Sequence, residues 1–272
     1  MVDAGDLSLA VYTYGPEHAP PLLLLHGFLS TGTAWHDVAV ALSDSRRIFA
    51  PDQRGRGMSQ HAPDGDYSTE AYVRDAEGLV KAFGISRMAL IGHSMGGNVA
   101  ITFANKHPGL VSSLVAVDMA PETVAGAATQ VQAGIAALGR TFDTWDRARE
   151  WQRTALPDIS EAAVERRLGA RFVERNGRIE WRQDPAILEY QQRHTPTSPE
   201  DRWGLLKGVR CRTLFLLGGK SGLVTDDVAT RAAATVPDGE WVRIDDAGHN
   251  VFEDNPANSI RSLRKFLAND PA

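Results

Sequence analysis

Cysteine is nearly missing from this chain of 272 residues. Cys211 is the only one, so no disulfide can form within the chain. A single thiol fits a reducing compartment. Because a free cysteine behaves as a small apolar residue, we expect Cys211 to lie in the core.

Long apolar runs and an excess of positive charge are missing as well. No run approaches the roughly 20 apolar residues of a membrane helix, and residues 1–6 lack the features of a secretory leader. The formal net charge of -5 provides no positive field that would attract phosphate backbones. We therefore expect a cytoplasmic globular protein with a small-molecule partner and neither a nucleic-acid nor a membrane partner.

Short apolar runs alternate with amphipathic stretches along most of the chain. Nearly continuous apolar strands are typical of a parallel sheet that helices cover on both faces. The predicted strands are 21–25, 47–51, 87–91, 110–118, 212–217 and 240–244. The predicted helices are 34–43, 69–83, 96–106, 225–236 and 256–268. This order predicts an α/β fold with a doubly wound, mostly parallel sheet.

The alternation stops between residues 121 and 207, where helical patterns replace the buried strands. We predict a mainly helical cap over 121–207, inserted into a core formed by 1–120 and 208–272. The alanine-rich stretch 125–137 predicts one helix of this cap.

Local signals predict three further features of the cap. Ser160 is placed to cap a helix that carries Val164, Leu168 and Phe172. Asp184-Pro185 supplies a capping residue and a first-turn proline for another helix. Between them, Asn176-Gly177 predicts a hairpin over 173–181.

The motif Gly92-His93-Ser94-Met95-Gly96 lies between a predicted strand and a predicted helix. Small residues flank a serine in this way because a tight strand-to-helix turn leaves little room, and the turn projects the hydroxyl above the sheet edge. The helix N-terminus behind it favours developing negative charge. We therefore predict Ser94 as a nucleophile; the alternative is a glycine-rich turn without function.

A serine nucleophile needs a general base, and His249 is the best placed histidine. It follows the last predicted strand and precedes the C-terminal helix, on the side of the sheet that carries Ser94. The other histidines lie on earlier loops or helices, beside the nucleophile or in the cap. They are His18, His26, His36, His61, His93, His107 and His194.

His26-Gly27-Phe28 directly follows the first predicted strand. This loop is placed to aim the backbone N–H of Phe28 at the carbonyl oxygen of a bound acyl group, and the N–H of Met95 supplies a second donor. We predict these two N–H groups as an oxyanion hole. For the His26 side chain we expect a structural hydrogen bond across the loop.

The chain resembles the α/β-hydrolase superfamily over nearly its whole length. The matching blocks are His26-Gly27-Phe28, Asp52-Gln53-Arg54-Gly55-Arg56-Gly57-Met58-Ser59, Gly92-His93-Ser94-Met95-Gly96-Gly97 and Gly248-His249. The resemblance implies the α/β-hydrolase fold and a catalytic triad, and it says almost nothing about the substrate. It also implies that Asp52 ties its loop to the arginines that follow it.

The acid of the triad departs from the commonest pattern of these relatives. Most carry an aspartate shortly after the strand that matches 213–217, where this chain has Ser221. Similar esterases carry the acid at the end of the preceding strand, sometimes with a serine as a fourth hydrogen-bonding member. The resemblance thus implies Asp118 as the acid, helped by Ser221. Asp226 and Asp246 remain open as alternatives.

Tryptophans and arginines are frequent in the predicted cap. The tryptophans are Trp145, Trp151, Trp181 and Trp203, and the arginines include Arg147, Arg149, Arg153, Arg166, Arg167 and Arg171. One interpretation is a pocket in which Trp145, Trp181 and His194 contact the substrate and arginines clamp a carboxylate. Acidic residues nearly balance these arginines, so the other interpretation is a set of solvated helix faces.

Together the motifs predict a serine hydrolase that cleaves a small carboxylic ester or thioester through an acyl-enzyme, with no metal or organic cofactor. An amide, a lactone or a C–C bond as substrate is compatible with the same triad, as is cofactor-free perhydrolysis. A ligand sensor that does not turn over is the alternative outside catalysis. Burst kinetics with a chromogenic ester separates a sensor from an enzyme.

Overall fold

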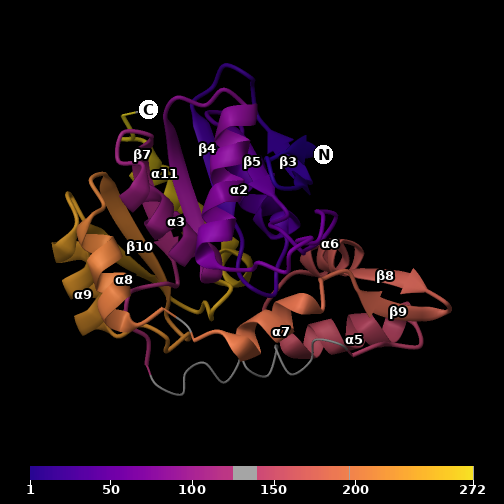
Figure 1. Ribbon diagram of the computed structural model, residues 1–272. Helices are drawn as coiled ribbons and strands as arrows, with labels where there is room; N and C mark the ends of the chain where they lie inside the picture. The colour runs from indigo at the N-terminus through magenta and orange to yellow at the C-terminus, as the bar shows by residue number, and fades with distance from the viewer. Residues whose placement is uncertain (125–139, 196, 272) are drawn as a thin grey trace.

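The computed structural model describes residues 1–124, 140–195 and 197–271 (Figure 1). Its centre is a seven-stranded sheet in the order β11-β10-β7-β6-β4-β5-β3. Neighbouring strands are parallel except β3, which pairs antiparallel with β5. The strands are β3 Val11–Tyr14, β4 Pro21–Leu25, β5 Arg47–Pro51, β6 Met88–His93, β7 Val111–Val117, β10 Arg212–Gly218 and β11 Glu240–Ile244. The predicted α/β fold is confirmed.

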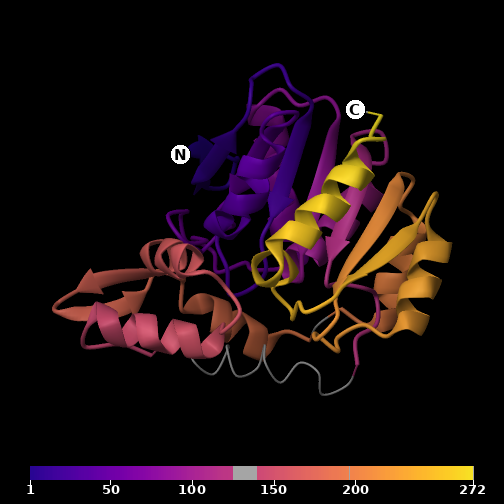
Figure 2. The same ribbon diagram turned by 180° about the vertical axis from the view of Figure 1, so that it is seen from behind.

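Alternate residues of the central strands enter two hydrophobic cores, one on each face of the sheet. In β4, Leu23 and Leu25 pack into one core, and Leu22 and Leu24 pack into the other. Helices α2 Thr69–Ala82 and α3 Met95–Lys106 cover the face in front in Figure 1, and α11 Pro256–Leu267 covers the face in front in Figure 2. Burial on both faces explains why the strands appear as continuous apolar runs.

The remaining core elements differ from the prediction mainly at their ends. The predicted helix 34–43 is a short 3₁₀ helix, η1 Gly32–Trp35, followed by α1 His36–Leu42. Two more helices follow the last strands, α9 Asp226–Thr235 and α10 Val251–Asp254. Strand β3 was not predicted, and neither was the small ribbon formed by β1 Val2–Asp3 and β2 Ser8–Leu9.

The described helices and strands between residues 145 and 193, which belong to the predicted cap, lie together at one end of the sheet (Figures 1 and 2). They are α5 Trp145–Ala155, α6 Glu161–Arg171, β8 Phe172–Arg175, β9 Arg178–Trp181 and α7 Ala186–Arg193. The next helix, α8 Pro199–Lys207, lies against α3, where Asn105 donates a hydrogen bond to the Leu205 carbonyl at 2.8 Å. The predicted helix at 125–137 falls outside the described residues.

Three local predictions for the cap can be compared with the structure. The Ser160 side chain accepts the N–H of Ala163 and caps α6, as expected. Asn176 and Gly177 have φ of 50° and 73° in the turn between β8 and β9, which suits the predicted hairpin. Phe172 was expected on the helix, but α6 ends at Arg171 and Phe172 begins β8.

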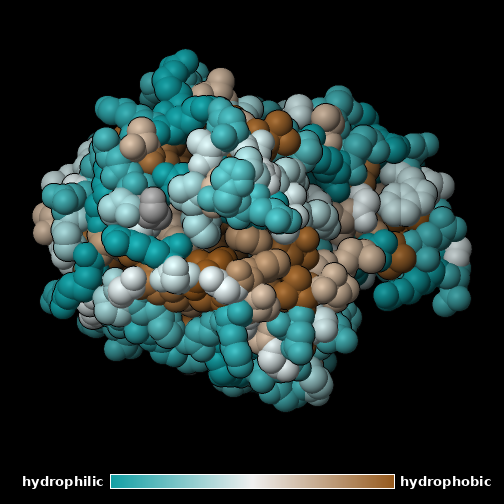
Figure 3. All heavy atoms as spheres, turned by 90° about the horizontal axis from the view of Figure 1, so that it is seen from above, coloured by the Kyte–Doolittle hydropathy of each residue, from teal (hydrophilic) through white to brown (hydrophobic). Residues whose placement is uncertain are grey.

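Figure 3 shows one face that is mostly hydrophilic, with apolar side chains gathered in a hollow band near its centre. Cys211 is buried, as expected. In the part of the chain that the structure describes, no helix is both long and apolar enough to cross a membrane.

Candidate active site

Ser94 occupies a strained turn between β6 and α3. Its φ is 53°, in a region that costs a non-glycine residue on the order of 1 to 3 kcal/mol. Glycine is required two residues later, because a Cβ on Gly96 would collide with the carbonyl oxygens of Leu25 and His26. The turn leaves the Ser94 hydroxyl half-buried beside the N-terminus of α3.

Ser94, His249 and Asp118 form a continuous chain of contacts. The Oγ of Ser94 lies 3.1 Å from Nε2 of His249, and Nδ1 of the same ring lies 2.7 Å from Oδ2 of Asp118. The Asp118 side chain is 1% exposed and the His249 side chain 16%. This geometry allows a proton to pass from the serine to the imidazole while the carboxylate holds the other ring nitrogen.

Asp118 follows β7 with a φ of 45°, and both of its carboxylate oxygens accept hydrogen bonds. Its Oδ2 also accepts the Ser221 hydroxyl at 2.5 Å, and Oδ1 accepts the Gly218 N–H at 3.1 Å. The two alternative acids lie elsewhere. Asp226 pairs with Arg243 at 2.6 Å and Asp246 with Lys220 at 3.1 Å.

His93 also belongs to this site, although the sequence predicted no role for it. Its Nε2 donates to the backbone carbonyl of His249 at 2.8 Å, and the two ring centroids are 4.7 Å apart. Burial, and then the neighbouring His249, hold the pKa of His93 well below its ordinary value, so the ring is neutral. His93 therefore positions the loop that carries His249. The only feature of the sequence that pointed to this role was the position of His93 directly before Ser94.

His26 makes the structural hydrogen bonds expected of it. Its Nε2 accepts the N–H of Gln53 at 2.9 Å, so the proton lies on Nδ1, which donates to the Gly27 carbonyl at 2.8 Å. Burial lowers the pKa of His26 to about 3. The neutral ring thus fixes the loop that carries Gly27 and Phe28.

The two predicted oxyanion donors belong to residues near Ser94: Met95 follows it directly, and a Cβ on Gly27, the residue before Phe28, would lie 3.5 Å from the Cβ of Ser94. The N–H groups of Phe28 and Met95 donate to no residue that the structure describes. Gly27 lets this loop approach the elbow, because a Cβ there would lie 2.8 Å from Nδ1 of His93. Buried Arg56 contacts both residues. Its Nε donates a hydrogen bond to the Phe28 carbonyl at 2.8 Å, and its Nη2 lies 3.5 Å from the Met95 sulfur.

Asp52 does not bind the arginines that follow it, so that expectation was wrong. Its Oδ1 accepts the Gly32 N–H at 2.7 Å, and its Oδ2 accepts the Met58 N–H at 2.9 Å. Burial raises the pKa of this carboxyl to about 6. Arg54 pairs instead with Asp75, through two contacts of 2.7 Å. Asp52 therefore holds two backbone segments in place instead of binding an arginine. A side-chain pattern in the sequence does not reveal such bonds to backbone amides.

The three predicted substrate contacts in the cap have different surroundings. Trp145 packs against the small hydrophobic core of the cap, and Trp181 lines a cavity beside the loop after β4. His194 is exposed and stacks on Tyr190, with ring centroids 3.9 Å apart. Substrate contact by these residues stays a prediction.

Most of the described arginines of the predicted cap are paired with carboxylates, and most of these pairs are at least partly exposed. The pairs are Arg147–Glu150, Arg149–Glu165, Arg153–Glu161, Arg166–Asp37 and Arg167–Glu253. The last pair is buried and joins the cap to α10, just after His249. Within the described residues, Arg171 has no carboxylate partner. No three metal-ligating side chains gather there to hold a metal ion.

The fold agrees with comparisons to known proteins. Residues 20–256 match the family model described as the alpha/beta hydrolase fold, so the chain belongs to this family. It is 31% identical to the sn-1-specific diacylglycerol lipase of Mus musculus, covering 93% of this chain and 83% of that protein.

A second relative is similar over almost the full length. The 2-(acetamidomethylene)succinate hydrolase of Mesorhizobium japonicum is 26% identical over 98% of this chain and 94% of its own. A solved structure of E-2-(acetamidomethylene)succinate hydrolase superposes with a TM-score of 0.89, covering 98% of this chain and 97% of that one. A marine microorganism esterase gives a TM-score of 0.76 at 27% identity, covering 96% of this chain and 100% of its own.

The buried neutral histidines predict a loss of stability in mild acid. Once unfolded, His26 and His93 bind protons below about pH 6.5, whereas the folded chain keeps them neutral until far lower pH, about 3 for His26. Each of these two histidines should therefore lower the free energy of unfolding by about 1.4 kcal/mol per pH unit as the pH drops below 6.5. Asp52 and Asp254, whose pKa burial raises to about 6, act in the opposite direction below that pH, so the contribution of a histidine is measured as the difference in slope between the native chain and its variant. Urea unfolding midpoints between pH 7 and pH 5 measure this slope.

Two variants separate the histidines from other titrating groups. His26→Gln should reduce the slope by about one proton, and His18→Gln, at an exposed position, should leave it unchanged. An unaltered slope in His26→Gln would contradict the assignment of His26 as a buried neutral ring.

Proposed function

We propose that this chain is a serine hydrolase that cleaves a small carboxylic ester or thioester through an acyl-enzyme. The observation that carries the proposal is the contact chain from Ser94 through His249 to Asp118, at 3.1 and 2.7 Å. The N–H groups of Phe28 and Met95, which have no acceptor among the described residues, would supply the remaining requirement, a site for the oxyanion.

The geometry supports a two-step acyl transfer. Nε2 of His249 takes the Ser94 proton as Oγ attacks the acyl carbon, and the N–H groups of Phe28 and Met95 bind the developing oxyanion. Asp118 keeps the remaining proton on Nδ1 and stabilises the imidazolium. His249 then protonates the leaving alcohol or thiol. In the second step it activates a water molecule, which releases the acid and frees Ser94.

Covalent labelling tests the proposal directly. A fluorophosphonate probe should modify Ser94 alone, because this serine combines a general base with an oxyanion site. With 4-nitrophenyl acetate we expect a burst of about one equivalent of nitrophenol followed by steady turnover. Peptide mapping by mass spectrometry and stopped-flow absorbance measure the two results. A label on another serine contradicts the assignment, and a burst without turnover favours a ligand sensor.

A second candidate substrate is 2-(acetamidomethylene)succinate itself. It is favoured by the TM-score of 0.89 and by the 26% identity to the hydrolase named for this compound. Incubation of the compound with the native chain and with Ser94→Ala, followed by chromatography, tests it. Serine-dependent disappearance faster than that of simple esters would favour this candidate over ester hydrolysis.

A further inference from the structure

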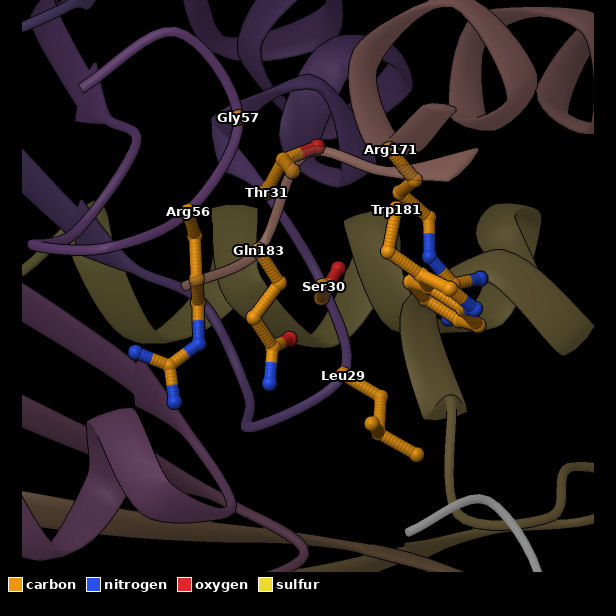
Figure 4. Close-up of a pocket in the computed structure, with 8 residues that line it drawn as sticks. All are labelled: Leu29, Ser30, Thr31, Arg56, Gly57, Arg171, Trp181 and Gln183. Atoms are coloured by element: carbon orange, nitrogen blue, oxygen red, sulfur yellow. The ribbon is translucent and has the colours of Figure 1, made fainter. Parts of the chain in front are cut away.

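Helix α6 of the cap carries three arginines, and their side chains reach three different places. Arg166 crosses to the core, where it pairs with Asp37 of α1 at 2.7 Å. Arg171 stays within the cap; Figure 4 shows its side chain lying along the Trp181 ring, and its Cζ lies 4.8 Å from the ring centre. Arg167 crosses to α10, the short helix that follows the proposed base. Arg167 thus joins the cap to the segment that carries this base.

The contacts that Arg167 makes with this segment are buried and directional. Its Nε donates to Oε1 of Glu253 at 2.8 Å, and its Nη2 donates to the other oxygen of the same carboxylate. Nη2 also donates to the side-chain oxygen of Asn250 at 3.3 Å. Both side chains of the ion pair are 4% exposed. Because a planar guanidinium that binds a carboxylate through two nitrogens has a fixed orientation, Arg167 fixes α10 relative to the cap.

Two further contacts hold the loop that carries His249, and both come from elements outside the cap. His93 donates to the His249 carbonyl at 2.8 Å, and Oδ2 of Asp254 accepts the Gly248 N–H at 2.9 Å. These two contacts bind the backbone at His249 and before it. Arg167 instead binds side chains that come after it, so the loop is held on both sides of the base.

The backbone transmits the contacts of Arg167 to the ring of His249. The Glu253 N–H donates to the Asn250 carbonyl at 2.8 Å, so the two partners of Arg167 lie in one tight turn, and Asn250 is bonded directly to His249. The ring nitrogens contact the proposed acid at 2.7 Å and the nucleophile at 3.1 Å. Such contacts tolerate little movement, because a displacement of about 1 Å can cost about 100-fold in rate.

We infer that Arg167 is a positioning residue for the base of the proposed hydrolase, acting on the ring through its neighbours and not on the substrate. By binding Asn250 and Glu253, it holds the His249 ring in the orientation in which Nδ1 carries a proton and Nε2 accepts one. The inference rests on the proposed function, and it links the placement of the cap to the reactivity of the site.

The double variant Arg167→Met/Glu253→Met tests the inference in a chain that keeps its fold. Replacing a buried ion pair by apolar side chains of similar size leaves no charge buried alone, so the unfolding midpoint should stay near the native value. We expect kcat for 4-nitrophenyl acetate to fall about 10- to 100-fold and KM to change by less than about 3-fold, because the base is displaced while the substrate contacts are kept.

Two single variants show whether the effect belongs to Arg167. Arg166→Met removes the neighbouring ion pair, which joins the cap to α1 instead of α10, and should leave kcat and KM within about 2-fold of the native values. Arg167→Lys keeps a cation beside Glu253 but loses the planar group that also reaches Asn250. Its kcat should lie between those of the double variant and the native chain. Since it leaves no carboxylate buried alone, it tests the same point if the apolar pair proves unstable.

Heteronuclear NMR of isotope-labelled histidine rings reports the orientation of His249 without any substrate. In mildly alkaline solution, where histidine rings are neutral, the native ring should hold its proton on Nδ1, because the contact with Asp118 selects that tautomer. The double variant should show a mixture of the two tautomers. Arg166→Met should show the native pattern.

The outcomes separate this inference from the proposed function. A single native tautomer in the double variant, a kcat within about 3-fold of native, or an equal loss in Arg166→Met overturns the role of Arg167. A raised KM with a native kcat also overturns it, because Arg167 would then support substrate binding and not the base. If the tautomer depends on Arg167 but the native chain turns over no ester, the positioning of His249 stands and the hydrolase proposal fails.

Discussion

Ser94→Ala is expected to lower kcat by about a million-fold, the loss found when the serine of another triad is removed. The reason is that Oγ is the attacking atom in the proposed mechanism, and without it His249 Nε2, 3.1 Å away in the native chain, has no serine proton to accept. The measurement is steady-state hydrolysis of 4-nitrophenyl esters by the native chain and the variant. Binding of the substrate should change little, because the hydroxyl is small.

Three further variants show whether the loss arises from the chemistry. Ser94→Gly also removes the hydroxyl but relieves the φ of 53°, so it should be equally inactive and at least as stable as the native chain. His249→Ala combined with Ser94→Ala should be little worse than either alone, because the two residues act as a unit. Ser45→Ala, at an exposed position, should retain full activity. Near-native turnover in Ser94→Ala would refute the assignment.

The parallel strands could be predicted from the sequence because burial on both faces leaves a continuous apolar run, as in Leu22 to Leu25 of β4. Strand β3 could not be predicted in the same way. Its residues, Val11–Tyr14, are half-buried or exposed, and it is held at the sheet edge by backbone pairing with β5. Such pairing leaves little trace in side-chain pattern.

Ser94 and His249 could be proposed as nucleophile and base from the sequence because their motifs are local, whereas most of the contacts around them come from distant parts of the chain. Sequence spacing left three acids open for His249, and the contact at 2.7 Å that favours Asp118 joins residues 131 positions apart. The support that His93 gives the His249 backbone, and the capture of Asp52 by amides at Gly32 and Met58, likewise depend on tertiary approach. Side-chain identities alone do not encode these contacts.

Asp118→Asn is expected to lower kcat about ten-thousand-fold while the fold survives, since asparagine tolerates the φ of 45° that Asp118 adopts. The Gly218 N–H, 3.1 Å from Oδ1, requires an acceptor and therefore keeps the amide oxygen on its side. The new NH₂ group then faces Nδ1 of His249 and donates to it. That places the ring proton on Nε2, where the imidazole no longer accepts the proton of Ser94. Steady-state kinetics and the unfolding midpoint measure both parts of the prediction.

Control variants at the neighbouring positions decide whether Asp118 is the acid. Ser221→Ala removes one neutral hydrogen bond to Oδ2 and should cost about tenfold, because such a bond contributes roughly 0.5 to 1.5 kcal/mol. Asp226→Asn and Asp246→Asn lose only exposed ion pairs and should retain at least a third of native kcat. The assignment fails if Asp118→Asn stays within tenfold of the native rate, or if either of the other two variants loses a thousand-fold. These comparisons apply to variants whose unfolding midpoints match that of the native chain. A lowered midpoint in a variant would attribute its loss of activity to damage in the loop that carries His249.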